Sequence, residues 1–281
     1  MRTRISIAVA LLGLTAGVAS AQAPAAPAQG ANDIKAVLYQ VSNAHGMLRG
    51  VNEVDAITSQ LFEGTGTMSV DAQAGRPAQD FKITKYKAEV NYFYPGMRID
   101  IERVGSSATT PERLIPVVSG THAWNEVNMP GGPATADMST LNARLLEVWM
   151  LPHGVVKAAR KAPDKVVIAM QNGMRTLTIP LPAPLSGTMK ATLNAKNQVA
   201  QVVATVQDGG RQTVIETTYD DYTDPDLSDI VFPHRIVRKS GGRTLLDLTV
   251  ASAVMYNPYV IMPVPENVEK ASTGAATPRT R

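Results

Sequence analysis

The residues best suited to chemistry in this chain are four histidines and a run of aspartates. The histidines stand at His45, His122, His153 and His234, and the chain contains no cysteine. A zinc site requires several His, Cys or carboxylate ligands that converge on one point. No two of these histidines have the spacing of a metal motif, although folding could still assemble His122, His153 and His234. We therefore predict that the protein binds no metal.

Other catalytic patterns are also weak. The sequence has no Gly-x-Ser-x-Gly motif, and Ser106-Ser107 lies in a polar stretch without an activating base nearby. The aspartates between positions 220 and 229 could supply oxygen ligands to Ca²⁺, but they lack EF-hand spacing, which favours a solvated loop. Gly131-Gly132 and Gly241-Gly242 are interpreted as turns because neither pair opens a helix after a strand. We assign no catalytic residue and no cofactor, and the sequence favours binding over catalysis.

The N-terminus has the pattern of an export signal. Arg2 and Arg4 precede an apolar run from Ile5 to Val18, and Ala19-Ser20-Ala21 forms a small-residue cleavage site. The apolar run is shorter than the ~20 residues that a membrane span requires. We therefore predict a signal peptide over 1–21, a periplasmic or secreted location, and no transmembrane segment in the mature chain.

Charge argues against a nucleic-acid partner. The formal net charge is +3, and removal of Arg2 and Arg4 with the signal would leave +1. Such a balance is typical of a solvated mixed surface and does not provide the basic patch that nucleic acids require. Residues 22–31 are rich in Ala, Pro and Gln and are predicted to be a disordered leader. A single β-rich domain is expected over 32–266, followed by a disordered tail over 267–281.

The central part of the chain is patterned as strands. Between Phe62 and Tyr256 about a dozen segments alternate apolar and polar residues, with turn signals such as Gln171-Asn-Gly173 between them. So many strands predict a large antiparallel sheet that must curl, split or close. A helix is expected from Ile34 to about His45, because Asn32 or Asp33 can cap it. The predicted fold is mainly β, a curved antiparallel half-barrel with an N-terminal helix.

The passage from Leu141 to Ala162 interrupts this pattern with helical spacing. Pro152 disfavours a helix interior but suits a first turn, so we predict two short helices with a bend at Leu151-Pro152. A helix pair within a meander is expected to cover one face of the curved sheet. This arrangement predicts an apolar cavity between the helices and the concave face.

Three passages carry a family resemblance: Ser119–Asn125, Val148–Ala159 and the stretch from Tyr219 to Asn257. Together they resemble the N-terminal β-rich, non-catalytic region of secreted bacterial metallo-β-lactamase-fold hydrolases. The last stretch is also similar, more loosely, to periplasmic lipoprotein carriers. In the first family a His-x-His-x-Asp-His zinc motif in a following domain carries the catalysis, and this sequence lacks the motif. The resemblance therefore implies a β-rich region and supplies no catalytic residue.

Large side chains within these passages are the candidate ligand contacts. Trp124, Trp149, Met150 and Phe232 are predicted to line the cavity, although the same residues could simply fill the core. The favoured function is an exported binding or carrier module for an acyl chain, a lipid or a lipidated peptide. The first alternative is a protein-interaction module that partners a separate hydrolase through an exposed edge strand, such as the one ending at Val250. The second alternative is an enzyme related to these hydrolases.

Overall fold

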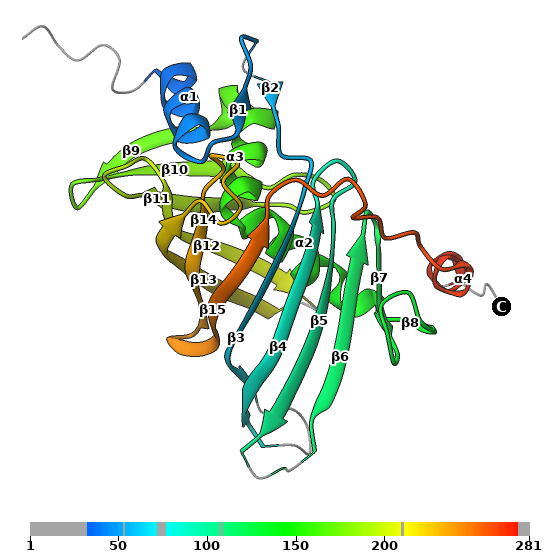
Figure 1. The fold of residues 1–281 in the computed structure, drawn as a ribbon. Helices are drawn as coiled ribbons and strands as arrows, with labels where there is room; N and C mark the ends of the chain where they lie inside the picture. The colour runs from blue at the N-terminus through cyan, green and yellow to red at the C-terminus, as the bar shows by residue number, and fades with distance from the viewer. Residues whose placement is uncertain are drawn as a thin grey trace, which may run out of the picture.

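The computed structural model describes residues 33–274, except for 53, 72–76, 107, 109, 209 and 210. The predicted signal peptide over 1–21 and the predicted leader over 22–31 lie outside these residues. The described residues form a mainly β structure in which helices accompany one large open sheet (Figure 1). This confirms the fold class expected from the sequence.

Thirteen strands form the large sheet, and a two-stranded hairpin precedes them. The strands are β1 Leu48–Arg49, β2 Val54–Asp55, β3 Ser59–Val70, β4 Gln79–Asn91, β5 Gly96–Gly105, β6 Glu112–Ser119, β7 His122–Glu126, β8 Ala134–Ala136, β9 Val167–Gln171, β10 Met174–Pro180, β11 Thr188–Leu193, β12 Val199–Asp208, β13 Arg211–Thr223, β14 Phe232–Ser240 and β15 Arg243–Val254. The helices are α1 Ile34–Ala44, η1 Met138–Thr140, α2 Leu141–Met150, α3 Pro152–Lys161, η2 Pro163–Lys165 and α4 Glu266–Gly274.

The path of the chain through the sheet begins and ends at its centre. The strand order is β8-β7-β6-β5-β4-β3-β15-β14-β13-β12-β11-β10-β9, and every pair is antiparallel. From β3 the chain meanders outward to the edge at β8. It then crosses through α2 and α3 to the opposite edge at β9 and returns to β15, which pairs with β3. The sheet is strongly curved and remains open between its two edges (Figure 1).

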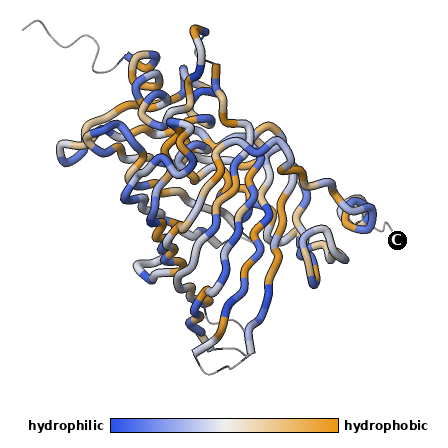
Figure 2. The backbone as a smooth tube through the Cα atoms, in the orientation of Figure 1, coloured by the Kyte–Doolittle hydropathy of each residue, from blue (hydrophilic) through white to orange (hydrophobic). Residues whose placement is uncertain are grey.

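The two faces of the sheet differ because side chains alternate along each strand. In β5, Met97, Ile99 and Ile101 belong to the main core, whereas Arg98 and Glu102 form ion pairs on the other face. Figure 2 shows the same alternation of hydrophobic and hydrophilic residues along β3 to β6. The concave face therefore carries the main core, and α2 and α3 pack against it.

The helix pair forms as the sequence predicts. Pro152 occupies the first turn of α3, where its missing N–H group costs no helical hydrogen bond. Leu151 separates the helices with an extended backbone, at φ −58° and ψ 147°. Gly154 allows the close approach of the two helices, since a Cβ atom there would lie 2.2 Å from the carbonyl oxygen of Val148. The bend at Leu151-Pro152 is thus confirmed.

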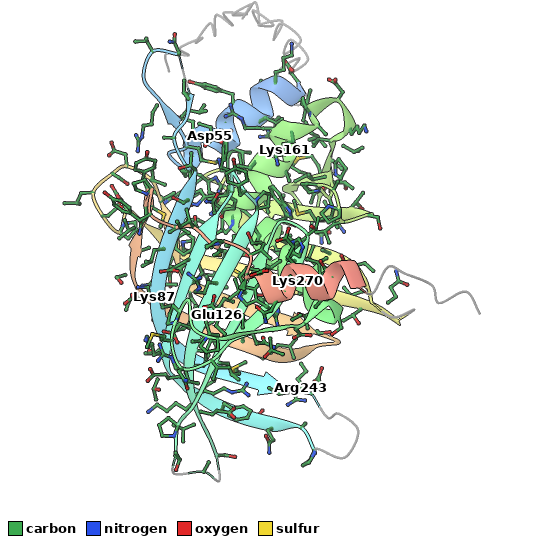
Figure 3. The ribbon with its side chains drawn as sticks, turned by 90° about the vertical axis from the view of Figure 1, so that its right-hand side faces the viewer. Asp55, Lys87, Glu126, Lys161, Arg243 and Lys270 are labelled. Carbon is green, nitrogen blue, oxygen red and sulfur yellow. The ribbon has the colours of Figure 1, made fainter. Side chains whose placement is uncertain are left out.

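A second, smaller core lies on the opposite side of β6 and β7. Ile115, Val117 and Trp124 face away from the main core and pack against Val260 and Val268 of the C-terminal segment. In Figure 3, α4 lies in front of the strands, at the position marked by Lys270. The expectation of a disordered tail from residue 267 is therefore corrected for 267–274, because these residues belong to α4, which buries Val268. Residues 275–281 lie outside the described part of the chain.

Two further differences concern the late strands. β15 is not an edge strand: it lies between β14 and β3, so the expectation of an exposed edge ending at Val250 is wrong. The periodicity of β15 specified a strand, but its neighbour β3 lies far away in the sequence. Asp220 and Asp221 also belong to β13 and not to the predicted acidic loop.

No helix among the described residues has both the length and the apolar character needed to cross a membrane.

Candidate functional site

A cavity of about 320 Å³ lies between α2 and the concave face of the sheet. Strands β3 to β6 and β13 to β15 surround it, and α2 supplies the remaining wall. Its apolar lining is Met68, Tyr86, Met97, Ile99, Ile101, Leu114, Pro116, Val118, Ile215, Leu245 and Leu246. This volume lies at the lower end of the range for small-molecule sites, ~300–1,000 Å³. The cavity can therefore hold one slender apolar group.

The lining follows from strand periodicity. Met97, Ile99 and Ile101 occupy alternate positions of β5, so all three point to the concave side. Most of the residues in this apolar lining are buried, but Leu114 of β6 is 37% exposed. Leu114 is therefore a wall residue that remains accessible from solvent.

Charged side chains of α2 border the apolar floor. Arg144 and Glu147 stand one helical turn apart, and Arg238 of β14 donates a hydrogen bond from Nη1 to Glu147 Oε1 at 2.6 Å. Burial has the largest single effect on the pKa of Arg238 and lowers it, but Glu147, Tyr86 and Tyr219 together raise the pKa above its ordinary value. This partly buried ion pair connects α2 to β14.

Arg144 connects α2 to the early half. Its Nη1 donates to the carbonyl oxygen of Val117 at 3.0 Å, and its Nη2 donates to Asp137 Oδ2 at 2.8 Å. Burial lowers the pKa of Arg144, and the charges of Asp137 and Glu147 oppose that shift. Each of these cations already has an anionic partner, so the charges stabilise the position of α2. The apolar lining is therefore the candidate binding surface.

The four predicted ligand contacts are core residues in this structure. Trp149, Met150 and Phe232 are buried in the main core, and none of them lines the cavity beneath α2. Trp124 is buried in the second core on the opposite face of the sheet. Their size led to the prediction, but large side chains fill cores as readily as they line cavities. The alternation of Met97, Ile99 and Ile101 with charged neighbours was the better sequence signal for the cavity.

The histidines do not assemble a metal site. His153 lies in α3 with its Nδ1 atom 2.9 Å from Gln60 Oε1, whereas His122 interacts with Ser272 in α4 and His234 is exposed. Among the described residues, no group of three or more His, Asp or Glu side chains is arranged to hold a metal ion. The absence of bound zinc therefore stays a prediction for elemental analysis.

The acidic loop uses its carboxylates to fold the chain. Asp224 accepts hydrogen bonds from the backbone N–H groups of Ser228 and Asp229, at 3.1 and 2.9 Å. Asp226 accepts from the N–H group of Met255 at 3.0 Å. These contacts give the loop a structural role, in line with the preference for a loop over a Ca²⁺ site.

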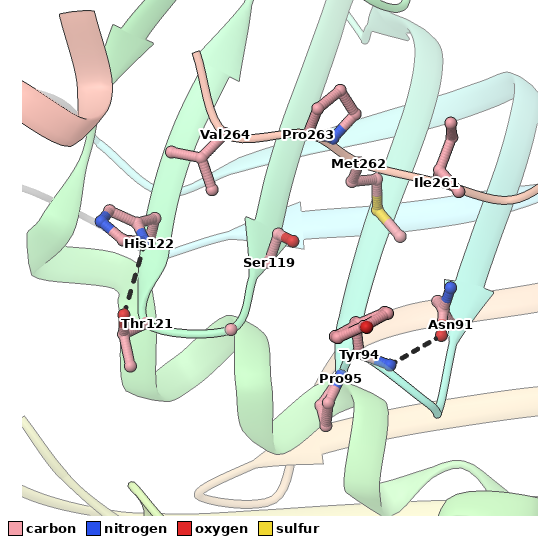
Figure 4. Close-up of a pocket in the computed structure, with 11 residues that line it drawn as sticks. Asn91, Tyr94, Pro95, Ser119, Thr121, His122, Ile261, Met262, Pro263 and Val264 are labelled. Carbon is pink, nitrogen blue, oxygen red and sulfur yellow. Dashed lines mark hydrogen bonds between the residues drawn. The ribbon is translucent and has the colours of Figure 1, made fainter. Parts of the chain in front are cut away.

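A second cavity, of about 470 Å³, lies beside the C-terminal segment (Figure 4). Tyr94, Pro95 and His122 form one side of it, and the segment from Ile261 to Val264 crosses the other. Sequence reasoning did not identify this cavity, because its walls come from two turns and a distant segment. We assign it no ligand.

Comparisons with known proteins give remote structural likenesses. No family model matches the chain, and no curated protein matches its sequence. A putative outer membrane lipoprotein-sorting protein domain from Vibrio parahaemolyticus is similar, with a TM-score of 0.46 and 10% identity, over 86% of this chain and 99% of the other. A LolA superfamily protein from Nitrosomonas europaea has a TM-score of 0.41 and 8% identity, over 82% and 96%.

A third structure, a DUF1329 family protein from Desulfovibrio piger, has a TM-score of 0.35 and 9% identity, over 82% of this chain and 95% of the other. The resemblance to the N-terminal region of metallo-β-lactamase-fold hydrolases receives no support from these comparisons.

Proposed function

We propose that this chain is an exported carrier that binds an apolar chain, such as an acyl group of a lipid or lipidated peptide, beneath α2. The observation that carries the proposal is the apolar cavity between α2 and the concave face. Burial of apolar surface contributes roughly 25 cal/mol per Å², so a chain inserted there would gain affinity without any charged contact. The proposed location is the periplasm, on the basis of the export signal in the sequence.

The bordering charges support binding more than catalysis. Arg238 is paired with Glu147, and Arg144 with Asp137, so these groups are engaged in holding α2. A catalytic acid or base needs a free position beside the reacting atom. Besides Arg144, Glu147 and Arg238, the described residues that line the cavity include one further ionisable side chain, Tyr86, whose pKa is raised by burial. The phenol therefore stays protonated near neutral pH.

Filling the cavity tests the proposal. Leu114→Trp adds a large side chain at a wall position that is already partly exposed, so the fold should tolerate it. We expect the parent protein to bind a fluorescent fatty-acid probe. The affinity of the variant for the probe should be lower by a factor of about ten or more, which is a loss of about 1.4 kcal/mol or more. Probe titration by fluorescence gives both dissociation constants.

Val127→Trp is the matched control, because Val127 is 49% exposed and does not line the cavity. It should bind the probe as the parent does. Failure of the parent to bind the probe, or equal weakening in both variants, would refute the proposed site. Native mass spectrometry of protein from its own periplasm then identifies a ligand that co-purifies with it.

A further inference from the structure

One edge strand of the large sheet is covered by a helix, and the other edge strand is open. β8 is covered at one edge by α4, where Asn267 Nδ2 donates a hydrogen bond to the carbonyl oxygen of Ala134 at 2.8 Å. β9 forms the other edge, and among the described residues it pairs with β10 alone. The outward backbone groups of β9 are therefore available to another strand.

β9 lacks the features that usually protect an edge. Exposed edges commonly carry lysine, proline or a bulge that prevents pairing with another chain. The β9 sequence, Val-Ile-Ala-Met-Gln, has no charged residue and no proline, and its register with β10 is regular. Val167 is 61% exposed and Met170 is 63% exposed, although both side chains are apolar. The edge thus combines free backbone groups with uncovered apolar surface.

The strand also matches itself. In antiparallel pairing centred on Ala169, Ile168 would lie opposite Met170 of a second copy, and Val167 opposite Gln171. No like charges would face each other. Met170 of each copy would be covered by Ile168 of the other copy. We propose that β9 pairs with β9 of a second copy of this chain, about a two-fold axis at Ala169. The two sheets then join edge to edge in an isologous dimer.

A charge exchange at Ala169 tests both the partner and the register. Ala169 is exposed, so Ala169→Lys and Ala169→Glu should each fold normally. Two lysines or two glutamates at the two-fold axis would repel, whereas a lysine facing a glutamate would attract. We expect the parent to show a rising dimer fraction over an about hundredfold concentration series in sedimentation velocity. Each variant alone should remain monomeric, and an equimolar mixture of the two should recover the dimer.

Val214→Lys is the matched control, because Val214 is exposed but lies on β13 in the interior of the sheet. It should dimerise as the parent does, and all variants should melt near the parent temperature. A monomeric parent across the series, or single variants that dimerise like the parent, would overturn the proposal. A mixture that stays monomeric would overturn the register at Ala169.

Discussion

Trp149 shows that sequence can place a residue along the chain without specifying how it packs. Its place beside the bend at Pro152 was predicted correctly, but its ring is 1% exposed and sits within the main core. Lys161 lies over the ring, with Nζ 4.5 Å from the centroid. Sequence periodicity gives the side of a helix on which a residue lies, whereas the volume enclosed there depends on all the neighbouring strands.

Trp149→Ala should therefore behave as a core truncation. We expect the free energy of unfolding to fall by about 3–5 kcal/mol, because the substitution leaves a large cavity in packed surroundings. Urea denaturation, followed by circular dichroism, measures the loss. Trp149→Phe keeps most of the apolar volume and should lose much less. A small loss in Trp149→Ala together with weaker probe binding would instead place Trp149 at the ligand.

His45 couples the fold to pH. Its Nδ1 donates to the carbonyl oxygen of Val41 at 2.8 Å, and its Nε2 accepts from the N–H group of Val199 at 3.3 Å, so the ring is held neutral. Burial lowers the pKa of His45 from 6.5 to about 4. The pKa of His153, whose ring centroid lies 5.8 Å away, is also lowered, mainly by burial and then by His45 and Lys157.

At His45 the unfolded chain takes up a proton near pH 6.5, whereas the folded protein does so only near pH 4. Stability is therefore complete above pH 6.5 and falls as the pH decreases toward 4, by about 3 kcal/mol for His45 at 1.36 kcal/mol per pKa unit. Urea denaturation at pH 7.5 and at pH 5 should show this decline, which His45→Gln should reduce. His234→Gln, at an exposed position, should leave it unchanged. Equal stability at both pH values in the parent would contradict the burial of neutral histidines.

For helices, strands and turns, features set by neighbouring residues were predicted correctly, whereas contacts with residues far away in the sequence were not. The turn at Asn172-Gly173 follows from its sequence, since both residues have the positive φ, 51° and 77°, that such a hairpin requires. α4 was missed because it is a short polar helix with one buried anchor, Val268. The residues that bury Val268 belong to β6, β7 and the segment before α4. The sequence around Val268 does not indicate which residues these are.

Val268→Ala should loosen α4 from the second core without unfolding the main one. Trp124 shares that core, so its access to a soluble quencher such as acrylamide should increase. The experiment uses a Trp149→Phe background, in which Trp124 is the one tryptophan left of the two in the chain. Ala271→Ser, at an exposed position of the same helix, should leave quenching unchanged. Unchanged quenching in Val268→Ala would show that α4 does not depend on this anchor.

For the whole molecule, composition and turn spacing were sufficient to predict a large curved antiparallel sheet with helices on one face. They could not predict which strands meet at the centre, because the contact between β3 and β15 joins distant parts of the sequence. The site was only partly predictable for the same reason. The cavity needs Leu114, Glu147 and Arg238 from three separate regions, and their meeting depends on the curvature of the complete sheet.

The central pairing of β3 with β15 has a consequence for how the protein folds. The pairs within β3 to β8 and within β9 to β15 are between consecutive strands, so each half can form from local contacts. Pairing of Met68 with Leu246 closes a loop that contains all the residues between them, and contacts between residues so far apart in the sequence form slowly. Gly66 lies at the junction of β3 with β15, called the seam below, where a Cβ atom would stand 2.0 Å from the carbonyl oxygen of Asp247. Until the seam closes, two half-sheets with open edges coexist on one chain, and the time taken to join them sets how long each is exposed to aggregation.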